Sequence, residues 1–199
     1  MTQETNKKRI EKIKAWGKDW GESLLIALIL ALFIRAFFFQ AFRIPSGSMR
    51  MTLIEGDRLI VNKLRYGPII PFTKKRIPGY SKPQRGDVVV FIYPEDRKRD
   101  FIKRLIALGG ETVELKEGNI YINGKLIDDP QIKKVYYYNR GPFGKAKERV
   151  EVPPGYYYVL GDNSASSQDS RFWGFVPEED VIGRAEFIYW PLHRIRVIE

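Results

Sequence analysis

Two serines separated by a glycine, Ser46 and Ser48, lie a few residues beyond the longest apolar run of this chain. A serine hydroxyl attacks a carbonyl group when a general base lies within hydrogen-bond reach. The usual base is histidine, but the chain has one histidine, His193, in a predicted turn near the C-terminus, and no cysteine. We therefore consider Ser48 as a nucleophile that uses another base. An ordinary polar loop is the simpler interpretation of the same residues.

A lysine can serve as that base if its amine is neutral near pH 7. Desolvation disfavours the charged form of an amine, so burial lowers the pKa of a lysine. Lys103 lies within the apolar segment FIKRLIAL (101–108), and strand alternation places it on the same face as Phe101 and Leu105. We interpret Lys103 as the candidate general base. A lysine that reaches solvent from the end of a strand is the alternative.

A third concentration of polar side chains is the segment 161–171 (GDNSASSQDSR), which follows a predicted strand. Its side chains could orient the base, and Asp169 and Arg171 have opposite charges and are close in sequence. Because Asp, Asn and Ser are frequent in turns, an exposed turn is the alternative here.

A membrane-spanning helix is the first element that would position these residues. Residues 24–34 are uninterrupted apolar sequence, and the run continues past Arg35 to Phe42. It reaches the roughly 20 apolar residues that a span requires. We predict an anchor over residues 23–42. A cleaved secretory signal would need small residues at its cleavage site, and the nearest candidate, Phe39-Gln40-Ala41, has Phe at the outer small position. A run without a polar stripe favours an anchor over a buried core helix.

The orientation of the anchor follows from the basic residues before it. Basic segments next to a span stay in the cytoplasm, whereas long domains cross the membrane largely regardless of charge. We therefore predict a cytoplasmic segment at residues 1–22 and a folded domain on the outer side. The basic side chains of this segment are Lys7, Lys8, Arg9, Lys12, Lys14 and Lys18.

Beyond the anchor the apolar pattern is that of β-strands, and no further helix is predicted. Asn123-Gly124 predicts a hairpin within 120–127, because both turn residues accept positive φ. Segment 66–85, rich in proline and glycine, predicts a loop. The fold class is mainly β, with barrel-like antiparallel sheets in a core (43–115 and 155–199) and a small β insert (116–154). Strands are predicted at 58–63, 87–93, 101–108, 112–115, 156–160, 182–190 and 194–198.

Five motifs behind the spanning segment resemble, in order and spacing, the bacterial type I signal peptidases, which are membrane-anchored serine endopeptidases with a Ser–Lys dyad. The resemblance extends from the apolar run to about residue 183 and is weak only across the insert. Met51 departs from it, because the family usually has proline there. The motifs are Ser46-Gly47-Ser48-Met49, Gly56-Asp57, RGDVVVF (85–91), Ile102-Lys103-Arg104, and GDN to SRFWG between residues 161 and 174.

The resemblance implies a role for each matching side chain. Ser48 would be the nucleophile and Lys103 the general base, and the Ser46 hydroxyl with the backbone N–H of Ser48 would form the oxyanion hole. Ser167 would hydrogen-bond Lys103. The other implied residues are an ion pair of Asp169 with Arg171, Arg104 near that pair, and substrate pockets lined by Phe42, Ile44, Met49, Leu53, Phe101 and Ile102.

The implied activity is the removal of N-terminal signal peptides from exported preproteins, after small residues in an Ala-X-Ala pattern and through an acyl-enzyme. The resemblance implies no cofactor and no metal, and a single-pass protein of the bacterial inner membrane whose catalytic domain is periplasmic. The net charge of +10 suits anionic membrane lipids as partners, beside secretory preproteins and the export machinery.

Two alternatives use different chemistry. A membrane-tethered barrel without catalysis could bind nucleic acid through its basic charge and the aromatic segment 136–140, although nucleic acid is scarce on the predicted side of the membrane. A Ser–His peptidase would require His193, and not Lys103, for activity.

Overall fold

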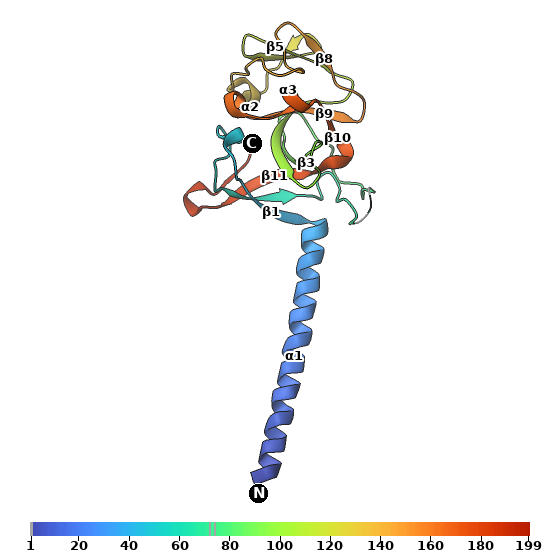
Figure 1. The fold of residues 1–199 in the computed structure, drawn as a ribbon, viewed down its shortest axis with the longest axis vertical. Coiled ribbons are helices and arrows are strands. Elements are labelled where there is room, and N and C mark those ends of the chain that lie inside the picture. The colour runs from blue at the N-terminus through green and yellow to red at the C-terminus, as the bar shows by residue number, and fades with distance from the viewer. Residues whose placement is uncertain (1, 72, 74) are drawn as a thin grey trace.

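A long N-terminal helix carries a β domain at its C-terminal end (Figure 1). The computed structural model describes residues 2–71, 73 and 75–199, without the side chains of residues 2–15 and 17–19. The basic side chains used to predict the orientation thus lie outside the described residues. Helix α1 runs from Thr2 to Phe37, so the predicted N-terminal segment and the anchor form one continuous helix.

The C-terminal part of α1 is the predicted anchor. Residues Trp20–Phe37 form an 18-residue stretch with a mean hydropathy of 1.9, none of it buried within the protein, and the stretch is long and apolar enough to cross a membrane. The structure therefore excludes a buried core helix. The helix ends at Phe37, before the expected limit at residue 42, because strand β1 (Phe39–Arg43) pairs with strand β2 (Arg58–Asn62).

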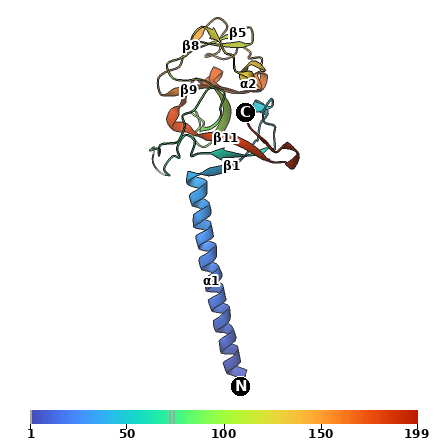
Figure 2. The ribbon, with the colours of Figure 1, turned by 180° about the vertical axis from the view of Figure 1, so that it is seen from behind.

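The main sheet is antiparallel and curls into a partial barrel (Figure 2). Its further strands are β3 (Val88–Ile92), β4 (Asp100–Ala107), β9 (Tyr156–Leu160), β10 (Val176–Pro177), β11 (Val181–Trp190) and β12 (Arg196–Val197). The strand order is β1-β2-β11-β3-β4-β9-β10, with β12 beside β11. Strand β11 holds the sheet together because it pairs with β2, β3 and β12. The predicted mainly β fold is confirmed.

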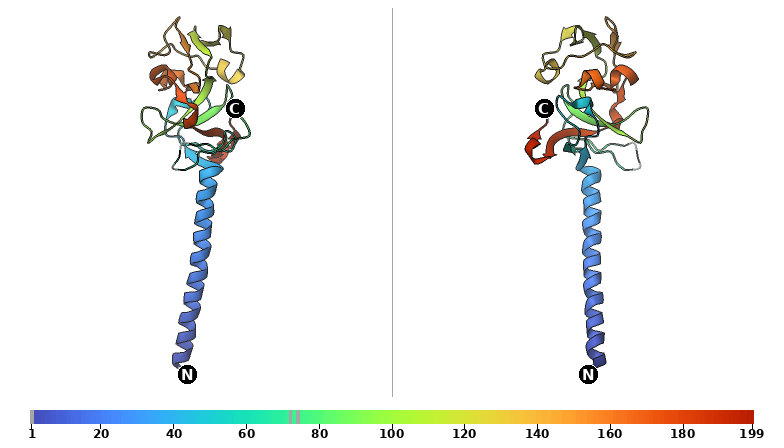
Figure 3. Two further views of the ribbon diagram at one scale, coloured as in Figure 1. Left: turned by 90° about the vertical axis from the view of Figure 1, so that its right-hand side faces the viewer. Right: turned by 60° about the vertical axis from the view of Figure 1, so that its left-hand side comes forward.

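A second, four-stranded sheet lies at the end of the domain farthest from α1 (Figures 1 and 3). Its strands are β5 (Thr112–Lys116), β6 (Asn119–Ile122), β7 (Lys125–Leu126) and β8 (Arg149–Glu151), in the order β7-β6-β5-β8. The predicted hairpin is confirmed, since Asn123 and Gly124 have φ angles of 51° and 77°. This sheet begins slightly before the predicted limit of the insert at residue 116.

The prediction that no helix follows the anchor is wrong. Two four-residue helices occur, α2 (Pro130–Lys133) and α3 (Ser170–Trp173). Each begins after an aspartate, Asp129 or Asp169, whose carboxylate accepts hydrogen bonds from backbone N–H groups of the first turn. Such single turns are too short to produce a helical apolar period, so the sequence pattern does not reveal them.

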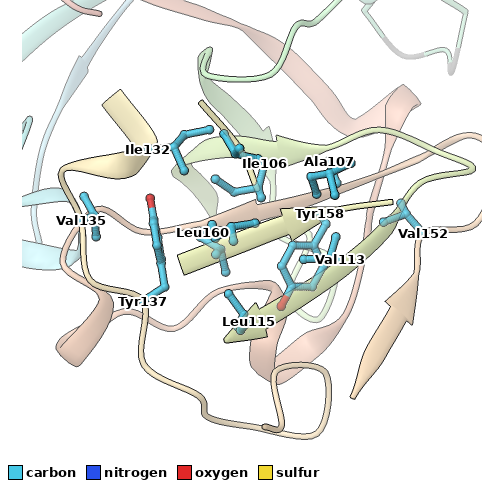
Figure 4. Close-up of a cluster of buried hydrophobic side chains, with 13 residues drawn as sticks. Ile106, Ala107, Val113, Leu115, Ile132, Val135, Tyr137, Val152, Tyr158 and Leu160 are labelled. Atoms are coloured by element: carbon cyan, nitrogen blue, oxygen red, sulfur yellow. The ribbon is translucent and has the colours of Figure 1, made fainter. Parts of the chain in front are cut away.

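Three clusters of buried apolar side chains stabilise the domain. The first packs the small sheet on the main sheet, with side chains from β4, β5, β9 and α2 pointing toward one another (Figure 4). The second surrounds Met49 and Leu53 and includes residues of β2, β3 and β11. The third lies among β3, β4, β9 and the start of β11. The second cluster anchors the chain segment that carries Ser48.

Candidate active site

The serine segment forms one turn of 3-10 helix, η1 (Gly47–Met49). Met49, within this turn, and Leu53, which follows it, are both 0% exposed in the second apolar cluster. Asn163 holds the turn from the other side: its side-chain amide donates to the Gly47 carbonyl (2.8 Å) and its backbone N–H to the Ser48 carbonyl (3.0 Å). These contacts hold Ser48 in one position.

The structure brings Lys103 next to Ser48, across a sequence separation of 55 residues. The Nζ atom of Lys103 lies 2.7 Å from Ser48 Oγ and donates to the Ile102 carbonyl at 2.9 Å. Lys103 comes from β4, where it pairs with Val89 of β3, and it is only 3% exposed. Its Nζ also lies 5.3 Å from the ring centroid of Phe101, as expected for residues that share a strand face.

Burial lowers the pKa of Lys103, which allows its amine to act as a base. Desolvation lowers the pKa of Lys103 from its ordinary value of 10.5 to about 8, although the charges of Asp169 and Asp162 act in the opposite direction. An appreciable fraction of the amines is then neutral at mildly alkaline pH. A neutral amine within hydrogen-bond distance of a serine hydroxyl can accept its proton, which is the requirement for nucleophilic attack.

A cavity of about 700 Å³ opens beside the Ser48–Lys103 pair, and Ser46, Phe101 and Ile102 line it with them. Strand β4 contributes an open edge to this cavity: it pairs with β3 over Asp100–Arg104 but with β9 only from Arg104 onward. The other four predicted pocket residues do not line the cavity. They belong to, or pack against, the second apolar cluster beneath the serine turn: Phe42, Ile44, Met49 and Leu53.

The predicted hydrogen bond from Ser167 to Lys103 is not formed. Ser167 is buried, and its hydroxyl has no hydrogen-bond partner among the described residues, because Lys103 Nζ is directed to Ser48 and the Ile102 carbonyl. Ser167 instead packs against Gly161. A Cβ atom at Gly161 would lie 2.1 Å from Ser167 Oγ and 2.6 Å from the Ser48 carbonyl oxygen, so only glycine fits between these two serines.

Two fully buried ion pairs support the site. The expected pair is present: the guanidinium of Arg171 donates to both carboxylate oxygens of Asp169 at 2.8 and 2.7 Å. Arg104 belongs to a separate pair and donates to both oxygens of Asp162 at 2.9 and 2.7 Å. Asp169 also accepts from the backbone N–H of Gly161 (3.0 Å), which ties the pair to the segment beside Ser48.

Sequence reasoning missed the roles of Asp162 and Asn163. Both follow strand β9 directly, within the Gly161-Asp162-Asn163 motif, and this position at a strand end was the available signal. Their partners could not be identified, because Arg104 lies 58 residues from Asp162 and Gly47 lies 116 residues from Asn163.

The structure gives no support to the alternative base. His193 is exposed on the single turn η4 (Leu192–Arg194) and does not line the cavity that contains Ser48. Among the described residues no group of three His, Cys, Asp or Glu side chains is arranged to hold a metal ion. The geometry of Ser48 and Lys103 suits nucleophilic attack by a serine hydroxyl with a lysine as base.

Comparisons with known proteins show what this chain is similar to. The family model described as "Signal peptidase, peptidase S26" matches residues 17–190. A probable signal peptidase I-2 of Synechocystis sp. is 37% identical over 100% of this chain and 84% of its own length. The signal peptidase I of Bacillus amyloliquefaciens is 36% identical over 98% of both chains. A crystal structure of a signal peptidase I from Enterococcus faecalis V583 matches 52% of this chain and 97% of its own, with a TM-score of 0.43 and 35% identity. The chain belongs to the signal peptidase family, peptidase S26.

Proposed function

We propose that this protein is a membrane-bound serine endopeptidase that removes N-terminal signal peptides from exported preproteins. The observation that carries the proposal is the distance of 2.7 Å between Lys103 Nζ and Ser48 Oγ, inside a cavity that an extended peptide can enter. Membership of the signal peptidase family supports the substrate class, and its relatives are named signal peptidase I.

In the proposed mechanism, neutral Lys103 accepts the proton of Ser48 as Oγ attacks the scissile carbonyl. The Ser46 hydroxyl and the backbone N–H of Ser48 stabilise the resulting oxyanion, and one such donor is worth about 3 kcal/mol in other acyl-transfer enzymes. Protonated Lys103 then donates its proton to the leaving amine, and an acyl-enzyme remains. Lys103, neutral again after this transfer, accepts a proton from a water molecule that attacks the ester, and it returns that proton to Ser48 Oγ as the acyl product leaves.

The substrate would bind as an additional strand beside β4. Residues 100–103 present a strand edge that β9 leaves free, and backbone hydrogen bonds to such an edge hold an extended peptide regardless of most side chains. Selection of small residues in the Ala-X-Ala pattern then comes from the space beside Phe101 and Ile102, which line the cavity.

The membrane anchor would hold the enzyme close to its substrate. Helix α1 is the proposed single span, with its N-terminus in the cytoplasm and the β domain on the periplasmic side, beside the export machinery. The β11–η4–β12 hairpin lies at the α1 end of the domain (Figures 1 and 3). We place this hairpin in the lipid interface and the surplus basic charge against anionic headgroups. Its exposed apolar side chains include Trp190, Leu192, Ile195 and Val197.

Three variants test the proposed function on a purified preprotein in detergent. Ser48→Ala and Lys103→Arg are expected to reduce cleavage by at least about a thousandfold, because the first removes the nucleophile and the second replaces the base with a group that stays charged. His193→Ala is the matched control and should retain wild-type activity. Loss of activity in His193→Ala together with an active Lys103→Arg enzyme would establish the Ser–His alternative instead.

A further inference from the structure

A second cavity, of about 320 Å³, adjoins the one that contains Ser48. Arg50 and Asn163 line both cavities. The lining of the second cavity also includes Lys134, Tyr136 and Tyr138, which come from the segment that follows α2 within the predicted insert. Because Asn163 hydrogen-bonds the backbone of the serine turn, the two cavities meet beside this turn.

The aromatic wall of this cavity is fixed to the active-site loop. The backbone N–H of Tyr138 donates to Ser164 Oγ (2.9 Å), and its carbonyl accepts from the guanidinium of Arg171 (2.8 Å). Tyr137 is 1% exposed in the first apolar cluster (Figure 4), so the alternation of the extended chain turns its neighbours outward. Tyr136 and Tyr138 are accordingly 59% and 45% exposed, with ring centroids 4.9 Å apart.

The cavity also presents a positive charge without a counterion. Arg50 forms an ion pair with Glu55 at 2.6 Å, and the one carboxylate in the lining, Asp162, is buried and paired with Arg104. Lys134 is exposed and, within the described part of the chain, has no carboxylate within salt-bridge distance. Its ammonium group donates to the side-chain oxygen of Gln131, a neutral partner, and so leaves the cavity with a positive charge that favours an extended peptide carrying an acidic side chain.

We propose that the second cavity binds the first residues of the mature protein, just after the cleaved bond, and favours an acidic side chain there. The proposal rests on the proposed function. If the residues before the bond lie along the β4 edge beside Phe101 and Ile102, the residues after it leave Ser48 on the other side, over Arg50 and Asn163. An extended chain advances about 3.3 Å per residue, so its first few residues reach the second cavity.

The experiment uses three preproteins that differ only at the second and third residues of the mature part, which are Glu, Ala or Lys. The full-length protein in detergent is expected to cleave the Glu substrate with a kcat/KM about fivefold above that of the Lys substrate, as for a well-placed exposed ion pair. Lys134→Glu should reverse this order. Lys133→Glu makes the same change at the neighbouring exposed lysine, which does not line the second cavity, and should keep the wild-type order.

Equal Glu-to-Lys rate ratios in the wild type and in Lys134→Glu would overturn this proposal. Failure to cleave any of the three substrates in a Ser48-dependent way would instead overturn the proposed function, so the two failures are distinguishable. Partial misfolding lowers all three rates of a variant together and leaves their ratio unchanged. If Lys134→Glu does not fold, Lys134→Gln provides the test, with an expected ratio near one.

Discussion

At the scale of single residues, the site depends on one buried amine. The fall in the pKa of Lys103 from 10.5 to about 8 corresponds to about 3 kcal/mol by which the protein disfavours the charged form. Between these pH values the unfolded chain still holds the proton that the folded chain has lost, so Lys103 makes stability rise with pH across this window. The same desolvation that costs stability at neutral pH prepares the lysine to act as a base.

The pH dependence of cleavage follows from this pKa. We expect kcat/KM to rise about tenfold per pH unit below pH 8 and to level off above it, because only the neutral amine of the free enzyme accepts the Ser48 proton. The measurement is a pH–rate profile with a preprotein that has no titratable side chain near its cleavage site. A profile that continues to rise toward pH 10.5 would show that Lys103 is not desolvated in solution.

At the scale of the elements, the sequence predicts the buried strands well and the short edge strands poorly. Segment 87–93 is apolar after Asp87, segment 101–108 is apolar apart from Lys103 and Arg104, and the structure places β3 and β4 within one residue of them. Strand β1 continues the apolar run of α1 without a glycine or proline between them, so its start depends on pairing with β2, which lies far along the chain.

The candidate site likewise has features that the sequence predicts and features that it does not. The chemistry offers Ser48 and Lys103 only as separate candidates, and the resemblance to the signal peptidases is what pairs them, because no sequence pattern shows that residues 55 positions apart come together. The partner of Arg104 does not follow, because charge alone does not choose among the aspartates of segment 161–171. That choice is made by the fold, which places β4 beside the end of β9 and so brings Arg104 to Asp162.

The buried ion pair of Arg104 with Asp162 predicts a large difference in stability between two aspartate variants. Asp162→Ala leaves Arg104 buried without a counterion and is expected to lower the free energy of unfolding by about 3–5 kcal/mol. Asp128→Ala is the matched control, because Asp128 pairs with Lys133 at the surface, and it should leave stability nearly unchanged. Denaturant unfolding followed by tryptophan fluorescence measures both. Equal effects of the two variants would contradict the buried geometry.

At the scale of the whole molecule, Ser48 and Lys103 lie on the domain that α1 carries, and the small sheet of this domain is at the end far from α1 (Figure 1). The β11–η4–β12 hairpin, which carries exposed apolar side chains, lies on the same side of the domain as the junction with α1 (Figures 1 and 3). Three apolar side chains that are close in sequence are each more than half exposed: Leu192, Ile195 and Val197. Such a patch is unusual on a surface that contacts only water. The bilayer surface is the proposed environment that covers them.

Membrane contact by this hairpin can be measured directly, because the chain has no cysteine and one introduced thiol is unique. Leu192→Cys, labelled with an environment-sensitive fluorophore in vesicles that contain anionic lipid, should emit at shorter wavelength and be quenched by brominated acyl chains. Leu126→Cys is the control, since Leu126 is also an exposed leucine but lies in the small sheet at the opposite end. An unquenched label at residue 192 would mean that α1 alone holds the domain at the membrane. Quenching at both positions would mean that the domain lies flat on the lipid, with the small sheet in contact as well.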